Sequence, residues 1–149
     1  MRFKRLLIAG LLSSVFAPCV HAGPYGDDLA KCLVASTTKE DRASLVRWMF
    51  AAAAANPAVA SIANVSPKVL EETNASTGAL MMRLLTDTCK DKTKAALTHE
   101  GRTTIQLGFS VLGQTAAVEL FSSPEVLQAI SGIGKSLDKK KLEDLLNNQ

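Results

Sequence analysis

The chain has 149 residues, 47% apolar and 5% aromatic, with 17 Lys and Arg against 14 Asp and Glu. Three of the basic residues lie within the first five positions, so the remainder carries 14 charges of each sign and is formally neutral. This balance excludes a nucleic-acid-binding surface, which needs a surplus of positive charge. An Ala-rich, aromatic-poor composition favours closely packed helices over a sheet.

The first 22 residues have the pattern of a secretory signal peptide. A basic start leads into an apolar run over residues 6–16, Pro18 ends this run, and Val20 and Ala22 are the small residues that a signal peptidase reads. A run of this length is shorter than the ~20 residues that cross a bilayer as a helix. We therefore expect cleavage between Ala22 and Gly23, and a periplasmic or secreted protein whose single domain spans 23–149.

The first half of the domain predicts a central helix. A helix over 27–35 contains Cys32, and a second helix over 39–55 follows Thr37, the predicted N-cap of a capping box with Glu40. Within this second helix, Trp48, Met49 and Phe50 are consecutive and cover more than half of the circumference. We expect several neighbouring helices around it and a buried Trp48.

One local pattern predicts three further helix starts. In each, a capping side chain precedes a proline at the first helical position. The three pairs are Asn56-Pro57, Ser66-Pro67 and Ser123-Pro124, which begin predicted helices over 57–64, 67–89 and 124–130.

The remaining segments are helical by the spacing of their apolar residues. They are a helix over 92–100 that ends at Gly101, a helix over 103–121, and an amphipathic tail over 137–147. Within 103–121, Gly108 and Gly113 would let a neighbouring helix approach closely. The chain thus predicts an all-α, bundle-like single compact domain of about six to eight helices with one disulfide.

The disulfide is expected from the cysteine count. Cys19 lies in the predicted signal peptide, which leaves Cys32 and Cys89. An even pair in an exported protein is most simply a disulfide, and two buried thiols are the alternative. Cys19 as a lipid-attachment site is a further alternative, although Phe16-Ala17-Pro18 matches that motif poorly.

Catalytic groups are scarce. His99 is the one histidine of the predicted mature chain, and position 103 is Thr, so a His-Glu-x-x-His zinc motif is absent. His99 and Glu100 do not converge, because adjacent helical residues point about 100° apart. No nucleophile elbow or phosphate-binding loop is present. We expect no catalytic residue, metal or cofactor, and a helix-end role for His99.

Two apolar stretches approach the length of a membrane span. The stretch over 45–63 contains Arg47 and the Asn56-Pro57 break, and the stretch over 105–121 contains Glu119 and two glutamines. Charged residues are costly inside a bilayer, so both stretches fit core helices better. We expect no stable membrane insertion.

A block of residues resembles a set of small exported helical proteins of Gram-negative bacteria. The block is Lys31-Cys32-Leu33, Thr38, Asp41-Arg42, Leu45-Val46, Trp48-Met49-Phe50, Asn56-Pro57 and Val59, and the similarity continues through Leu84, Cys89, Glu100-Gly101, Phe109 and Leu112-Gly113. The resemblance implies a periplasmic address and the pairing of Cys32 with Cys89. It implies no activity and no functional residue.

These observations favour a non-catalytic periplasmic module that binds another protein. An inhibitor or immunity-type protein that blocks a cell-wall-attacking toxin is one concrete form, suggested by size and address. The alternative is a small-ligand or lipid carrier with an apolar groove between Met81-Met82 and Phe109. A small hydrolase is a third interpretation.

Overall fold

The computed structural model describes residues 23–147. The predicted signal peptide, including Ala22 at its cleavage site, lies outside this range. Within it the chain forms one domain of eight α-helices, a π-helical turn, a 3-10 turn and no strand, which confirms the predicted all-α class. The elements are α1 (Pro24–Ala35), α2 (Lys39–Ala53), α3 (Pro57–Ala60), α4 (Pro67–Arg83), η1 (Leu84–Thr88), α5 (Lys90–Glu100), α6 (Thr103–Phe121), α7 (Pro124–Ser131), η2 (Gly132–Ser136) and α8 (Lys139–Asn147).

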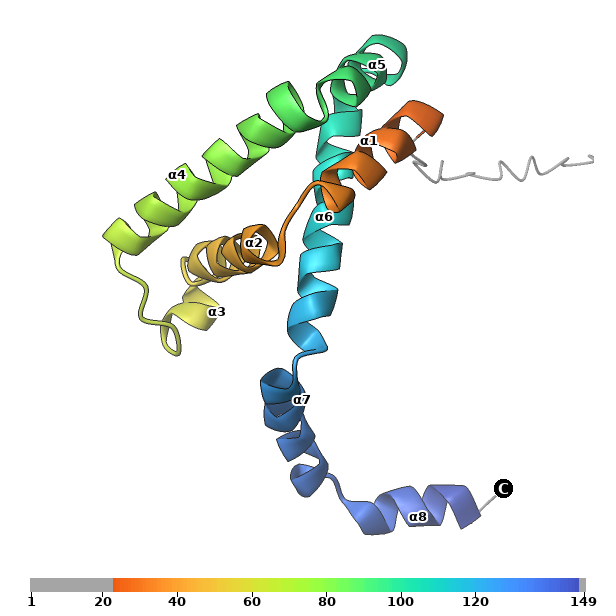
Figure 1. The fold of residues 1–149 in the computed structure, drawn as a ribbon. Helices are drawn as coiled ribbons and strands as arrows, with labels where there is room; N and C mark the ends of the chain where they lie inside the picture. The colour runs from red at the N-terminus through yellow and green to blue at the C-terminus, as the bar shows by residue number, and fades with distance from the viewer. Residues whose placement is uncertain (1–22, 148–149) are drawn as a thin grey trace, which may run out of the picture.

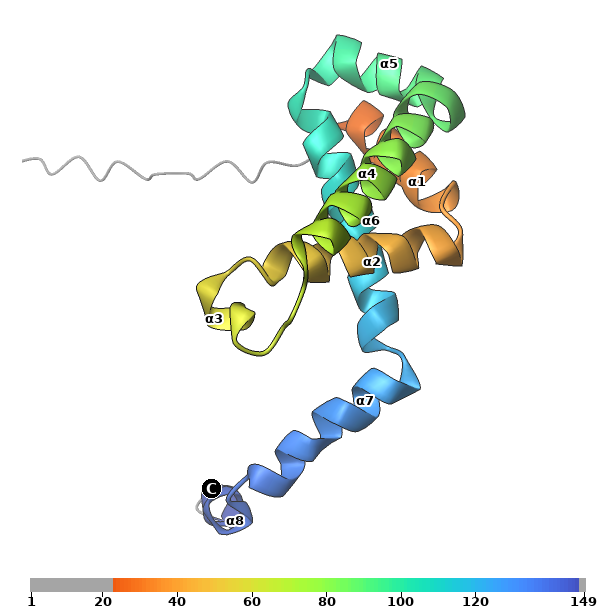
Figure 2. The ribbon, with the colours of Figure 1, turned by 90° about the vertical axis from the view of Figure 1, so that its left-hand side faces the viewer.

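Helix α6 is the axis on which the other helices assemble (Figures 1 and 2). Helices α1 and α5 pack beside its first half, α2 crosses it further along, and α4 packs on α2. Leucines and alanines fill the space between these helices, so the core is small and close-packed. The buried core residues are Leu29, Leu33, Leu45, Leu80, Leu84, Cys89, Ala96, Leu112 and Ala116.

The predicted proline-led helix starts are confirmed. Asn56, Ser66 and Ser123 each accept a hydrogen bond through the side chain from an amide in the first turn of α3, α4 and α7. The predicted cap of α2 is wrong by one residue: Thr38, not Thr37, forms the capping box, and its partner is Asp41. Thr37 is instead buried, and its hydroxyl donates to the Val34 carbonyl at the end of α1.

A π-helical turn follows α4 at Leu84–Thr88 and precedes α5. The sequence predicted that the helix starting at Pro67 would continue without this change to residue 89. The amide of Cys89 donates to the Leu84 carbonyl five residues earlier, at 2.8 Å. Beyond this turn the chain changes direction, and Cys89 lies against Cys32 of α1 with an S–S distance of 2.05 Å. The predicted disulfide is confirmed, and it ties α1 to the beginning of α5.

The burial expected around α2 is only partly present. Helix α2 packs against α4 and α6, so the opposite side of α2 faces solvent. Trp48 is half-buried and donates through Nε1 to Asn74 Oδ1 at 2.8 Å, and Phe50 is 59% exposed. The prediction of a buried Trp48 is therefore wrong.

The two glycines of α6 have different surroundings. A Cβ added at Gly108 would lie 3.0 Å from Leu33 Cδ1, so Gly108 is where α1 and α6 approach closely, as predicted. A Cβ at Gly113 would meet open space, so no helix packs there. Among residues 23–147, no helix has both the length and the apolar content that crossing a membrane requires.

Candidate binding groove

A stripe of α6 residues forms one wall of an open apolar groove. Phe109, Gly113, Ala117 and Phe121 recur at four-residue steps, so they lie on one side of the helix. Helix α2 crosses α6 here and supplies the opposite wall. We call this feature the α2–α6 groove; it consists of two adjoining hollows that share Met49.

The upper hollow lies between three helices and has a volume of about 350 Å³. Its lining is Leu45, Trp48 and Met49 of α2, Met81 of α4, and Phe109, Ser110, Leu112 and Gly113 of α6. Gly113 keeps the hollow open, because a side chain at that position would project into empty space. Met81 and Phe109 thus face one hollow, as the sequence suggested, whereas Met82 is 59% exposed and is not part of the lining.

The lower hollow has a volume of about 210 Å³ and is lined only by apolar residues. They are Met49, Phe50 and Ala53 of α2 with Ala117, Leu120 and Phe121 of α6. Phe50 and Phe121 are each more than half exposed. Sequence reasoning missed this hollow, because its two walls are more than 60 residues apart in the chain.

An ion pair holds α2 across α6 beside the groove. Arg42 Nε lies 2.8 Å from Glu119 Oε2, and Arg42 Nη1 donates to the Thr37 carbonyl at 2.7 Å. The hydrogen bond from Arg42 lowers the pKa of the Glu119 carboxyl. A third hollow of about 350 Å³ is lined by this pair together with Val46 and Leu120. The groove is therefore apolar inside and charged at its edge.

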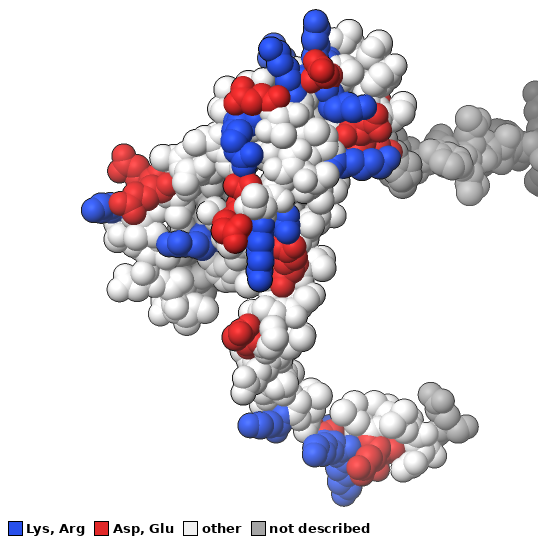
Figure 3. All heavy atoms as spheres, viewed as in Figure 1, with Lys and Arg blue, Asp and Glu red and all other residues white. Residues whose placement is uncertain are grey.

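Charges of both signs alternate over the face in Figure 3, and no region of that face has a single sign. This distribution agrees with the neutral balance expected from the sequence.

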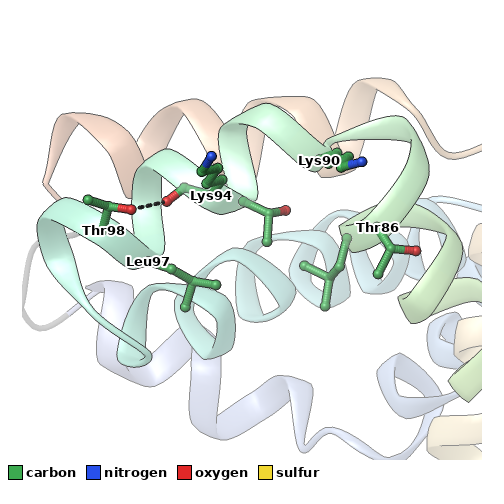
Figure 4. A pocket seen from close by; sticks show the side chains of 7 residues that line it. Thr86, Lys90, Lys94, Leu97 and Thr98 are labelled. Carbon is green, nitrogen blue, oxygen red and sulfur yellow. Dashed lines mark hydrogen bonds between the residues drawn. The ribbon is translucent and has the colours of Figure 1, made fainter.

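A separate hollow of about 470 Å³ lies along α5, where sequence analysis identified no functional residue. Figure 4 shows Lys90, Lys94, Leu97 and Thr98 along α5 and Thr86 on the preceding π-helical turn, with their side chains diverging. Thr98 Oγ1 donates to the Lys94 carbonyl at 2.8 Å, so this hydroxyl is used within its own helix. Because the side chains do not converge, this hollow is the weaker candidate for a ligand site.

His99 lies at the end of α5, as expected, and its ring stacks on Tyr25 with centroids 4.2 Å apart and an interplanar angle of 15°. The neighbouring Glu100 carboxylate accepts hydrogen bonds from the amides of Tyr25 and Gly26. Gly23, the predicted first residue after cleavage, is the N-cap of α1 and has no side chain to serve these amides. His99 and Glu100 therefore hold the start of α1.

No group of three or more His, Cys, Asp or Glu side chains within residues 23–147 is arranged to hold a metal ion. Comparisons with protein-family models, with curated proteins and with solved structures find no match to this chain.

Proposed function

We propose that this chain is a non-catalytic protein-binding module that acts in the periplasm or outside the cell, and that its partner docks in the α2–α6 groove. The observation that carries the proposal is the continuous apolar wall from Phe109 to Phe121 on α6, opposite Met49 of α2. Twelve residues of helix extend about 18 Å, which suits about three turns of an amphipathic partner helix.

The lining has the composition of a protein interface. Aromatic and methionine side chains are enriched at such surfaces, and Trp48, Phe50, Phe109 and Phe121 supply four aromatic contacts along the groove. Met49 and Met81 can adopt several rotamers and so adapt to a partner's shape.

Two observations support the extracytoplasmic address. The signal-like sequence of residues 1–22 and the disulfide between Cys32 and Cys89 both favour an oxidising compartment. An inhibitor or immunity-type protein that blocks an enzyme attacking the cell wall is one form of this function.

A second candidate function is a carrier of a small apolar ligand or lipid. The upper hollow favours it, because about 350 Å³ enclosed by Trp48, Met81 and Phe109 lies at the lower end of the range for ligand pockets. A carrier would be isolated with bound lipid, whereas a protein-binding module would be isolated with a protein.

A matched pair of glycine variants tests the proposal. Gly113→Leu fills the upper hollow, whereas Gly78→Leu adds the same side chain to an exposed position of α4 where it also meets open space. Wild type and both variants are purified from periplasm in native form, and co-purifying proteins and lipids are identified by mass spectrometry.

We expect one protein partner that is lost with Gly113→Leu, kept with Gly78→Leu, and bound again when both purified proteins are mixed. A stoichiometric lipid that Gly113→Leu displaces would favour the carrier instead. A protein partner that remains with Gly113→Leu would show that the groove is not the docking site.

A further inference from the structure

The third hollow, of about 350 Å³, lies between α2 and the C-terminal half of α6. Its apolar lining residues are Ala43 and Val46 of α2 with Ala116 and Leu120 of α6. Its charged lining residues are Lys39, Arg42 and Arg47 of α2 with Glu119 of α6. This hollow therefore combines an apolar surface with three cations and one anion.

The cations of the third hollow are not balanced by its own anion. Glu119 is paired with Arg42 at 2.8 Å, and within residues 23–147 neither Lys39 nor Arg47 forms an ion pair. Two further acidic residues follow Lys39 in the chain, but neither belongs to the lining: Glu40 is exposed, and Asp41 pairs with an arginine of α4. A surplus of positive charge therefore surrounds the apolar surface.

Arg42 is the fixed cation of this hollow. Its side chain is 17% exposed; Nε donates to Glu119 at 2.8 Å, and Nη1 donates to the carbonyl and the hydroxyl of Thr37 at 2.7 and 3.2 Å. The remaining nitrogen, Nη2, forms no hydrogen bond with the described residues and is not sealed from solvent. A guanidinium held in this way offers two N–H donors to an anion, with little further loss of side-chain freedom.

The surface between the charged side chains selects an apolar ligand body. It consists of the methyl and methylene groups of two alanines, a valine and a leucine. The one uncharged polar side chain of the lining is Ser123, whose Oγ already accepts from the amide of Val126 at 3.4 Å. A polar group buried on this surface would lack hydrogen-bond partners, whereas an alkyl chain gains free energy from burial.

We propose that the third hollow binds a single-chain amphiphile with an anionic head group, either a carboxylate or a phosphate. The alkyl chain covers the apolar lining, and the head group accepts hydrogen bonds from Nη2 of Arg42 and is attracted by Lys39 and Arg47. A volume of about 350 Å³ lies at the lower end of the range for ligand pockets, which suits one chain rather than two.

This site is separate from the one proposed for the protein partner. The third hollow shares Leu120 with the lower hollow of the α2–α6 groove and no residue with the upper hollow. The inference therefore does not depend on the function of the groove.

Calorimetric titration of the disulfide-bonded mature protein tests the choice of ligand. The probes are octanoate and octyl phosphate, which share an alkyl chain and differ in the head group. The controls are 1-octanol, which has the same chain without a charge, and acetate, which has the carboxylate without the chain.

Three phenylalanine or leucine variants identify the hollow that binds. Ala43→Phe fills the third hollow from an exposed position of α2. Ala52→Phe adds the same side chain to an exposed position of the same helix that lines none of the three hollows between α2 and α6. Gly113→Leu fills the upper hollow instead.

Two double variants test the role of charge. Lys39→Gln with Arg47→Gln removes the two unpaired cations of the third hollow. Lys90→Gln with Lys94→Gln removes the same charge from α5 and is the matched control. These variants leave the apolar lining intact, so they test the proposal even where Ala43→Phe fails to fold, which circular dichroism shows.

We expect at least one of the two anionic probes to bind at least tenfold more tightly than octanol, and acetate not to bind; the tighter probe identifies the head group. Ala43→Phe and the Lys39, Arg47 double variant should each weaken this binding at least tenfold, while the other three variants bind as wild type does. Equal affinities for octanol and both anions would overturn the proposal, as would the absence of any binding. Binding that Gly113→Leu abolishes and Ala43→Phe leaves intact would also overturn it and would assign the ligand to the upper hollow.

Discussion

Glu100 and Tyr25 are 75 positions apart, yet Oε1 of the Glu100 carboxylate accepts a hydrogen bond from the amide of Tyr25 at 2.9 Å. The second oxygen accepts from the amide of Gly26 at 2.8 Å. The last residue of α5 therefore caps α1, whose own N-cap is a glycine. A side chain at Gly23 would overlap this carboxylate, so the glycine and the remote cap belong together.

Glu100→Ala should lower the free energy of unfolding by about 1 kcal/mol, because two amides of the first turn lose their acceptor and the helix dipole loses its charge. Glu100→Gln keeps one acceptor and should lose less. Urea unfolding measures both, with exposed Glu72→Ala as the control. An effect of Glu100→Ala no larger than that of the control would contradict the capping role.

The sequence predicted local features better than remote ones. The caps at Asn56, Ser66 and Ser123 depend on neighbouring residues, and all three were identified. The cap from Glu100 depends on tertiary packing; the signal for it was the glycine at position 23, which leaves the amides of α1 without a local partner.

The groove and the amphipathic tail over 137–147 show the same limit. Periodicity identified the apolar stripe of α6 and the amphipathic tail, but not whether another helix covers them. A Cβ at Gly108 would press on Leu33 of α1, whereas a Cβ at Gly113, five residues on, would meet open space, and no propensity distinguishes these positions. The π-helical turn before Cys89 also depends on tertiary structure, because the disulfide requires the chain to change direction there.

Replacement of Gly113 or Gly108 of α6 by alanine should change the free energy of unfolding in opposite directions. Gly113→Ala should raise the free energy of unfolding by about 0.5–1 kcal/mol, because alanine favours the helix and its Cβ meets open space. Gly108→Ala should lower it by about 1 kcal/mol, because the methyl group is forced against fully buried Leu33. Thermal melting should give the highest melting temperature for Gly113→Ala, then wild type, then Gly108→Ala. A Gly108→Ala protein that is more stable than wild type would show that α1 can move away from α6 to make room for the methyl group.

Loss of the disulfide should destabilise the fold strongly. Cys32 and Cys89 are separated by 57 positions, and closing such a loop stabilises a domain by about 4 kcal/mol in the chain-entropy model. The Cys32→Ser, Cys89→Ser double variant should therefore unfold at a much lower urea concentration than wild type. Equal midpoints for the variant and the oxidised wild type would mean that the bond contributes nothing.

Stability should decrease in acid because three carboxylates pair across helices. Hydrogen bonds from Lys92 and Arg42 lower the pKa of Asp28 and Glu119, respectively. Burial raises the pKa of Asp41, but hydrogen bonds from Thr38 and Arg83 outweigh it, and the net shift is downward.

A carboxyl whose pKa is lower in the folded state stabilises the fold above its unfolded pKa, and this stabilisation is lost as pH falls through the folded value. The urea concentration at the unfolding midpoint should therefore not change with pH near neutrality. It should decrease once the pH falls below the ordinary pKa values, which are 3.8 for Asp and 4.5 for Glu. Glu119→Gln should make this decline shallower, and an unchanged slope would argue against a role for the Arg42–Glu119 pair.

His99→Ala should change stability but not partner binding. The ring of His99 stacks on Tyr25 at the start of α1. The residues that line the α2–α6 groove come from α2, α4 and α6, so His99 is not part of the groove. An aromatic pair contributes about 0.5–1.5 kcal/mol, and the lower end applies here because both rings are exposed. His99→Phe should restore the stacking and the stability, while partner affinity stays at the wild-type value in both variants. A hundredfold loss of biological activity in both, with the fold of His99→Phe as stable as wild type, would instead make the imidazole part of an active site and overturn the non-catalytic proposal.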